Sequence, residues 1–115
     1  MKIAEQVGIS PLPRHRGRER FLKGPVPWSW LQAASRAGGK GVEVGLALWL
    51  MGGMTGNGIV RISLSRIARD FGFDRASATR GLAALERAGL ARVKRTPGRS
   101  VEVTILPAPM CEPGQ

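Results

Sequence analysis

The chain has 115 residues, which is enough for one compact domain that needs no disulfide to hold its core together. Its 18 Lys and Arg residues outnumber 8 Asp and Glu residues, and the net charge of +10 predicts a polyanionic partner, either nucleic acid or an acidic membrane surface. A single cysteine and a single histidine exclude an intrachain disulfide and a zinc site made of these two residue types.

Residues 1–24 are rich in Pro, Gly and Arg and carry no hydrophobic periodicity, so we interpret them as a flexible basic arm. No stretch of the sequence resembles a secretion signal. The most apolar run, residues 46–51, is far shorter than the roughly 20 residues that span a bilayer. We therefore expect a cytoplasmic protein without a membrane partner.

The first helix is expected over residues 28–36, after a Pro-Val-Pro segment, because proline is tolerated in the first turn of a helix. Trp28, Leu31 and Ala34 or Ser35 recur at helical spacing along one side of it. The Gly-Gly pair at 38–39 is expected to end the helix.

A second helix is expected over residues 40–51 and should end at the glycine pair 52–53. It is apolar on several sides, which one small core cannot cover. We therefore expect a homodimer formed through these N-terminal helices, residues 25–53. The core and dimer contacts are expected to include the three tryptophans of this half, Trp28, Trp30 and Trp49.

The next elements are a short strand at residues 59–62 and a helix at residues 63–71. Ser63 is a favourable N-cap for this helix, because a serine hydroxyl can accept a hydrogen bond from a backbone amide of the first turn. The helical spacing predicts a buried stripe made of Leu64, Ile67, Ala68 and Phe71.

A third helical pattern follows a tight turn at Gly72. It begins at Asp74, a second favourable N-cap, and ends at Gly89. Residues that recur at helical spacing are predicted to face the core, and these are Ala78, Leu82 and Leu85.

The opposite face of this helix combines arginine with small residues. A helical wheel places Ala76, Ser77, Arg80, Ala84 and Arg87 opposite Leu82. A solvated face ordinarily carries long side chains of both charges, whereas small residues let the backbone lie close to another surface. Since the major groove of DNA admits one helix and arginine pairs with the guanine edge, this face predicts a helix that lies in a groove.

A β-hairpin is predicted from the alternating segments 90–95 and 101–105. Its tip, residues 96–99, has basic neighbours that could follow a phosphate backbone or enter a minor groove. Between Arg61 and Arg99 the chain has ten basic residues and three acidic ones, so the positive charge is shared by the helices and the hairpin.

The segment RISLSRIARDFGFDRASATRGLAALERAGLARVKRTPGRSVEVTIL resembles the winged helix-turn-helix domain of bacterial transcriptional regulators such as the MarR-like and GntR-like families. SLSRIARDFGF is similar to the first helix of the motif, DRASATRGLAALERAGL to the recognition helix, and the rest to the wing. The resemblance covers residues 59–106. It implies an α+β fold, mostly α with a β-hairpin wing, over residues 25–106, with two extra N-terminal helices, the arm and a loose tail at 107–115.

The resemblance also implies which residues meet double-stranded DNA. Four positions match the DNA-facing side of the recognition helix, and two match the phosphate-contacting start of the first motif helix. Three basic residues belong to the wing. The predicted DNA-contacting residues are, in that order, Arg75, Ser77, Thr79, Arg80, Ser65, Arg66, Lys94, Arg95 and Arg99.

We therefore expect sequence-specific binding of double-stranded DNA by a small, nucleoid-associated transcriptional regulator. Two alternatives stay open: a DNA-binding protein of plasmid replication, partition or mobile-element excision, and a winged helix that binds nucleic acid non-specifically or binds a protein. An enzyme is not expected, because the carboxylates are scattered and the glycines do not form a phosphate-binding loop. Neither a metal nor a cofactor is expected.

Overall fold

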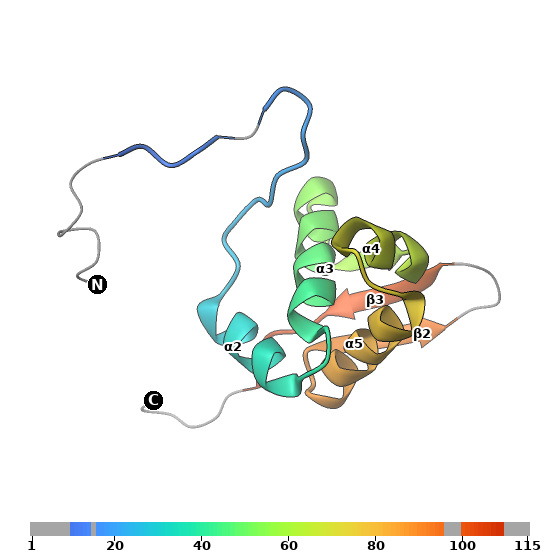
Figure 1. The fold of residues 1–115 in the computed structure, drawn as a ribbon. Helices are drawn as coiled ribbons and strands as arrows, with labels where there is room; N and C mark the ends of the chain where they lie inside the picture. Colours follow the sequence, from blue (N-terminus) through green and yellow to red (C-terminus); the bar gives the residue numbers. More distant parts are fainter. Residues whose placement is uncertain (1–9, 15, 96–99, 110–115) are drawn as a thin grey trace.

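The computed structural model describes residues 10–14, 16–95 and 100–109 (Figure 1). Within these residues the chain forms four helices and one three-stranded antiparallel sheet, so the predicted α+β class is confirmed. None of the described helices is both long and apolar enough to cross a membrane. The elements are α2 (Trp28–Ala37), α3 (Gly41–Thr55), β1 (Ile59–Ile62), α4 (Leu64–Phe71), α5 (Arg75–Arg87), β2 (Ala91–Arg95) and β3 (Val101–Ile105).

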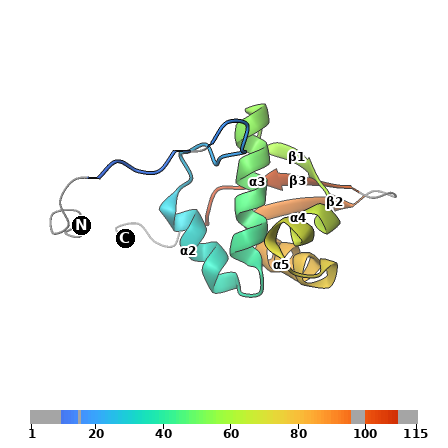
Figure 2. The ribbon, with the colours of Figure 1, turned by 45° about the horizontal axis from the view of Figure 1, so that its top comes forward.

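The sheet has the order β1–β3–β2, with β3 in the middle. Val103 at the centre of β3 lies opposite Val60 of β1 and Val93 of β2. Burial alternates along β1, where Val60 and Ile62 are buried and Ile59 is exposed, as expected for a sheet with one covered face. The helices supply that cover, because α3 and α5 lie on the same side of the sheet (Figure 2).

Of the two tryptophans of α2 that were expected among the core and dimer contacts, only Trp30 enters the core of the chain. Trp28 is 72% exposed, whereas Trp30 and Ala34 are fully buried. The Trp30 indole Nε1 donates a hydrogen bond to the Leu106 carbonyl oxygen at 2.8 Å, and its ring meets Trp49 edge to face at 5.7 Å. Both spacings, Trp28 to Leu31 and Trp30 to Ala34, suit a helix, so only the space left by neighbouring elements decides between them.

That space exists because glycines let the helices approach closely. A Cβ atom at Gly45 would lie 2.6 Å and 2.8 Å from two atoms of the Trp30 ring. A Cβ atom at Gly81 would lie 2.8 Å from the Lys40 carbonyl oxygen and 3.0 Å from Val44. Gly45 therefore makes room for α2 on α3, and Gly81 makes room for α3 on α5.

The predicted end of the second helix at the glycine pair 52–53 is wrong, because α3 continues to Thr55. Its left-handed C-cap is Gly56, with φ of +69°. Gly52 packs closely inside the structure: a Cβ atom there would lie 3.3 Å from Ile105 Cδ1. Tertiary packing of this kind outweighs the low intrinsic helix propensity of glycine, which costs roughly 1 kcal/mol per residue relative to alanine.

Both predicted N-caps are confirmed. Ser63 Oγ accepts a hydrogen bond from the Arg66 amide at 3.2 Å, and Asp74 Oδ1 accepts one from the Ser77 amide at 2.8 Å. The chain turns between α4 and α5 at Gly72, which has φ of +79°, a conformation that favours glycine.

The predicted buried stripe of α4 is confirmed at Leu64, Ile67 and Ala68 and wrong at Phe71. Phe71 is 46% exposed, and its ring stacks on Phe73 with centroids 6.1 Å apart. Because Phe71 is the last residue of α4, it projects beyond the core that its neighbours enter.

We expect Gly45→Ala to lower the free energy of unfolding by about 1–3 kcal/mol, because a methyl group would collide with a ring that is packed on all sides. Gly53→Ala is the matched control: it lies in the same helix, and its Cβ atom would meet only the Lys23 backbone carbonyl and Cβ, the latter at 3.2 Å, in an exposed segment. Both variants share the intrinsic helix gain of alanine. Urea unfolding that gave the two variants equal stability would contradict the close packing at Gly45.

Candidate nucleic-acid interface

The outward face of α5 is made of arginine and small residues. Arg75, Ala76, Thr79 and Arg80 are all exposed, and Ala83 beside them is half-buried. The wheel prediction was wrong for Ala84, which is only 3% exposed. Helix α5 contacts α2, α3, α4 and β2, so more of its circumference is buried than in a helix that packs on a single neighbour.

Arg80 is held in place by the first turn of its own helix. Its guanidinium Nη2 donates a hydrogen bond to Ser77 Oγ at 3.1 Å, and the Ser77 amide donates to Asp74. The Ser77 side chain, the Ser77 backbone amide and the nearby charge of Arg80 lower the pKa of the Asp74 carboxyl below its usual value. Ser77 is half-buried, and its hydroxyl oxygen accepts the hydrogen bond from Arg80.

Thr79 is exposed on the outward face of α5, whereas the helical wheel placed it at the edge of that face. Its hydroxyl donates a hydrogen bond to the Arg75 carbonyl oxygen at 3.0 Å, so the hydroxyl oxygen can still accept hydrogen bonds. Arg75, Thr79 and Arg80 therefore form one patch on the first two turns of α5.

Each acidic side chain between residues 59 and 95 has a hydrogen-bond or ion-pair partner within the protein. Asp70 pairs with Arg20 at 3.0 Å, Asp74 caps α5, and Glu86 pairs with Arg95 at 3.3 Å. Within the described part of the chain, this leaves several basic side chains of the segment without an ion pair to an acidic residue. They are Arg66, Arg69, Arg75, Arg80, Arg87, Arg92 and Lys94.

The end of β2 adds positive charge beside α5. Lys94 and Arg95 are exposed there, and the ion pair with Glu86 ties Arg95 to the last turns of α5. In Figure 1, the end of β2 and the start of β3 lie on the side of α4 and α5. The predicted strands of the hairpin are confirmed, whereas Arg99 and the rest of its tip, residues 96–99, lie outside the described residues.

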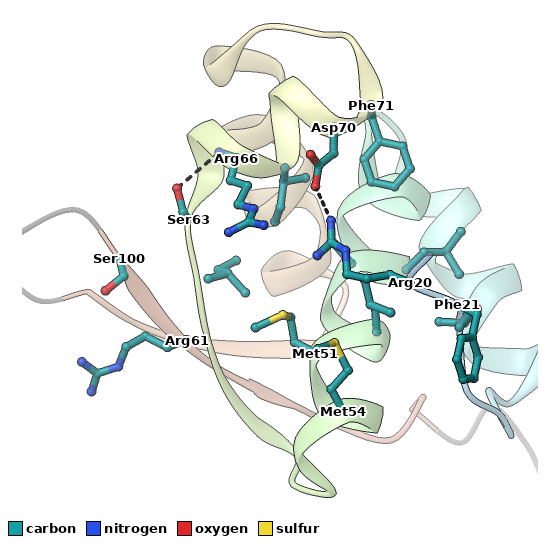
Figure 3. Close-up of a pocket in the computed structure, with 16 residues that line it drawn as sticks. Arg20, Phe21, Met51, Met54, Arg61, Ser63, Arg66, Asp70, Phe71 and Ser100 are labelled. Carbon is teal, nitrogen blue, oxygen red and sulfur yellow. Dashed lines mark hydrogen bonds and ion pairs between the residues drawn. The ribbon is translucent and has the colours of Figure 1, made fainter. Parts of the chain in front are cut away.

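The two predicted residues at the start of α4 lie on different flanks. Arg66 and Asp70, one helical turn apart, line a cavity between α3 and α4 (Figure 3). Ser65 and Arg69 are exposed and do not line it. Because successive residues of a helix are 100° apart, the Ser65 side of α4 stays available to an outside partner while Arg66 faces the cavity.

No pattern in the sequence predicted this cavity. Its volume is about 950 Å³, and one wall comes from the end of the basic arm, residues 20–22. The ion pair that brings the arm there joins Arg20 and Asp70, which are 50 residues apart in the sequence. No periodic pattern reports such a contact, and the methionines of the α3 region were the only hint of an adaptable apolar surface.

No metal site is evident in the described residues, where no three His, Cys, Asp or Glu side chains gather closely enough to hold an ion. In comparisons with known proteins, no family model matches this sequence, and no curated protein or solved structure is significantly similar to it.

We expect the cap at Asp74 to make α5 sensitive to acid. The pKa of Asp74 is lowered in the folded protein, so its stabilising effect is complete above the unfolded value of about 3.9 and is lost as the pH falls through the folded value. Asp74→Asn keeps a capping side chain but cannot titrate. Wild type should therefore melt at a higher temperature than Asp74→Asn near neutral pH.

Thermal unfolding followed by circular dichroism at decreasing pH measures this difference. The gap between the two proteins should narrow below about pH 4, where the Asp74 carboxylate takes up its proton. A gap that stayed constant down to about pH 2 would show that the charge of Asp74 does not stabilise the helix.

Proposed function

We propose that the protein binds double-stranded DNA through a winged helix-turn-helix, with α4 as the first helix of the motif, α5 as the recognition helix, and β2 and β3 as the wing. The order α3–β1–α4–α5–β2–β3, with β1 paired to β3, supports this interpretation. So does the tight turn at Gly72 between α4 and α5. The function that follows is sequence-specific regulation of transcription.

The observation that carries the proposal is the patch on the first two turns of α5. Arg75 and Arg80 are exposed there beside Ala76 and Thr79, these turns contain no acidic residue, and Asp74 just before them is used as the N-cap. Small residues allow the helix backbone to enter a major groove about 12 Å wide. The guanidinium groups would then reach guanine edges, while the lone pairs and methyl group of Thr79 would meet adjacent bases.

Arg80 is pre-positioned for this task. Its hydrogen bond to Ser77 limits the conformations of a side chain that otherwise loses about 2 kcal/mol of rotamer entropy when it is fixed. Phosphate contacts would come from the flanks: Ser65 and Arg69 on α4, and Lys94 and Arg95 at the end of β2. Such contacts position a protein on the duplex without reading its sequence.

The experiment that tests the proposal is selection of random duplex DNA by the full chain, near physiological salt and with excess competitor DNA. An enriched motif is the expected result. Recovery of no motif, with binding that disappears as salt rises, would leave only the non-specific phosphate interaction and would contradict sequence-specific regulation.

We expect Arg80→Ala to weaken binding to the selected site by about 1–3 kcal/mol and to relax the sequence preference at one position, because a paired hydrogen bond to a base is lost. Arg36→Ala is the charge-matched control, since Arg36 is an exposed arginine in the last turn of α2. Fluorescence anisotropy with the selected and a scrambled duplex provides both affinities. Equal losses for the two variants would argue against base recognition by Arg80.

We expect Lys94→Ala to weaken binding to all sequences alike and to reduce the slope of log K against log salt by about 1, because one phosphate contact is removed. Lys94 suits this test better than Arg95, which already shares its charge with Glu86. Arg36→Ala should leave the slope unchanged. An unaltered slope for Lys94→Ala would remove β2 from the interface.

A further inference from the structure

The cavity beside α4 has the composition of a ligand site. Its volume of about 950 Å³ falls at the upper end of the range for small-molecule pockets. Most of its lining is apolar and comes from α3 and α4, with the arm closing one side (Figure 3). The apolar lining includes Leu50, Met51 and Met54 of α3 and Ile67 and Phe71 of α4.

The wall formed by the arm is attached to the domain at two places. The guanidinium of Arg20 pairs with the Asp70 carboxylate at 3.0 Å. Three residues later, the arm passes so close to α3 that a Cβ atom at Gly53 would lie 3.2 Å from the Lys23 Cβ atom. The arm thus forms one wall of a space that α3, α4 and β1 also line and that stays open to solvent on another side.

The charged groups at this cavity leave one positive charge uncompensated. Asp70 is occupied by Arg20, and Arg61 points away from the cavity, 3.8 Å from Glu102 (Figure 3). Arg66 points into the space between α4 and α3 and has no acidic partner among the described residues. A cationic side chain at the edge of an apolar cavity is complementary to a ligand with an apolar body and an anionic end.

We infer that this cavity binds a small amphipathic carboxylate, whose carboxylate accepts hydrogen bonds from the Arg66 guanidinium while its apolar body lies against Met51 and Met54. A single available guanidinium matches a single carboxylate, which it can bind in a two-pronged fashion. A phosphate monoester carries more charge and would leave several oxygens without donors. The unbranched methionines can adjust to an apolar chain.

This site is independent of the proposed DNA binding and is tested without DNA. The probe is decanoate, titrated into the full chain by calorimetry below its micelle concentration, beside the neutral decanol and the cationic decyltrimethylammonium. We expect saturable binding of one decanoate per chain, and at least about tenfold weaker binding of the two other compounds, because they cannot accept hydrogen bonds from Arg66 as a carboxylate does.

Two variants on one helix separate the cavity from general charge attraction. Arg66→Gln removes the guanidinium that faces the cavity, and the N-cap hydrogen bond survives because it uses the Arg66 backbone amide. Arg69→Gln removes an exposed charge of the same helix that does not line the cavity. We expect a loss of about tenfold or more for Arg66→Gln and a change of less than about twofold for Arg69→Gln.

Three outcomes would overturn the inference. Decanoate could fail to bind, decanol could bind as tightly as decanoate, or the two variants could lose affinity equally. Light scattering on the same samples identifies one competing occupant: a stable dimer that binds no decanoate would mean that a second copy of the chain covers this face.

Discussion

The indole of Trp30 joins α2 to α3 and to the end of the sheet, and the positions of the other elements depend on this contact. Its ring fills the space above Gly45 on α3, meets Trp49 edge to face, and donates a hydrogen bond to the Leu106 carbonyl oxygen just beyond β3. One side chain therefore connects α2, α3 and the sheet. Burial of so large an aromatic ring stabilises the fold through the apolar area that it removes from water. The ring fits here because Gly45 on the opposing helix has no side chain.

The same device sets the orientation of α5. Gly81 lies against the Lys40 carbonyl oxygen and Val44, so α5 is pressed onto the N-terminal end of α3. This contact, together with the burial of Leu82 and Leu85, fixes which side of α5 faces outward. Since the opposite side of α5 is packed against the core, Arg75, Thr79 and Arg80 lie on the outward side, where a partner can reach them.

Helix α4 separates two surfaces of different character. On its solvent-exposed side it presents Ser65 and Arg69, for which we propose contacts to the phosphates of DNA. Toward α3 it presents Arg66 and Asp70 to an apolar cavity, one wall of which the arm forms. The acidic residues of this region form caps and ion pairs, so both surfaces keep positive charge. The surface with Ser65 and Arg69 is exposed and polar, whereas the cavity is mostly apolar and has one available guanidinium, that of Arg66.

The local rules of the sequence determined most of the secondary structure. The caps at Ser63 and Asp74, the turn at Gly72, the strands at 59–62 and 101–105 and the inward side of α5 depend on neighbours within a few residues, and all of these were predictable. Tertiary structure alone decided that Trp30 rather than Trp28 is buried, that α3 passes through its glycine pair, that Ala84 is covered, and that Arg20 meets Asp70. These outcomes depend on how closely separate elements approach, and periodicity along one element contains no information about the shape of its neighbours.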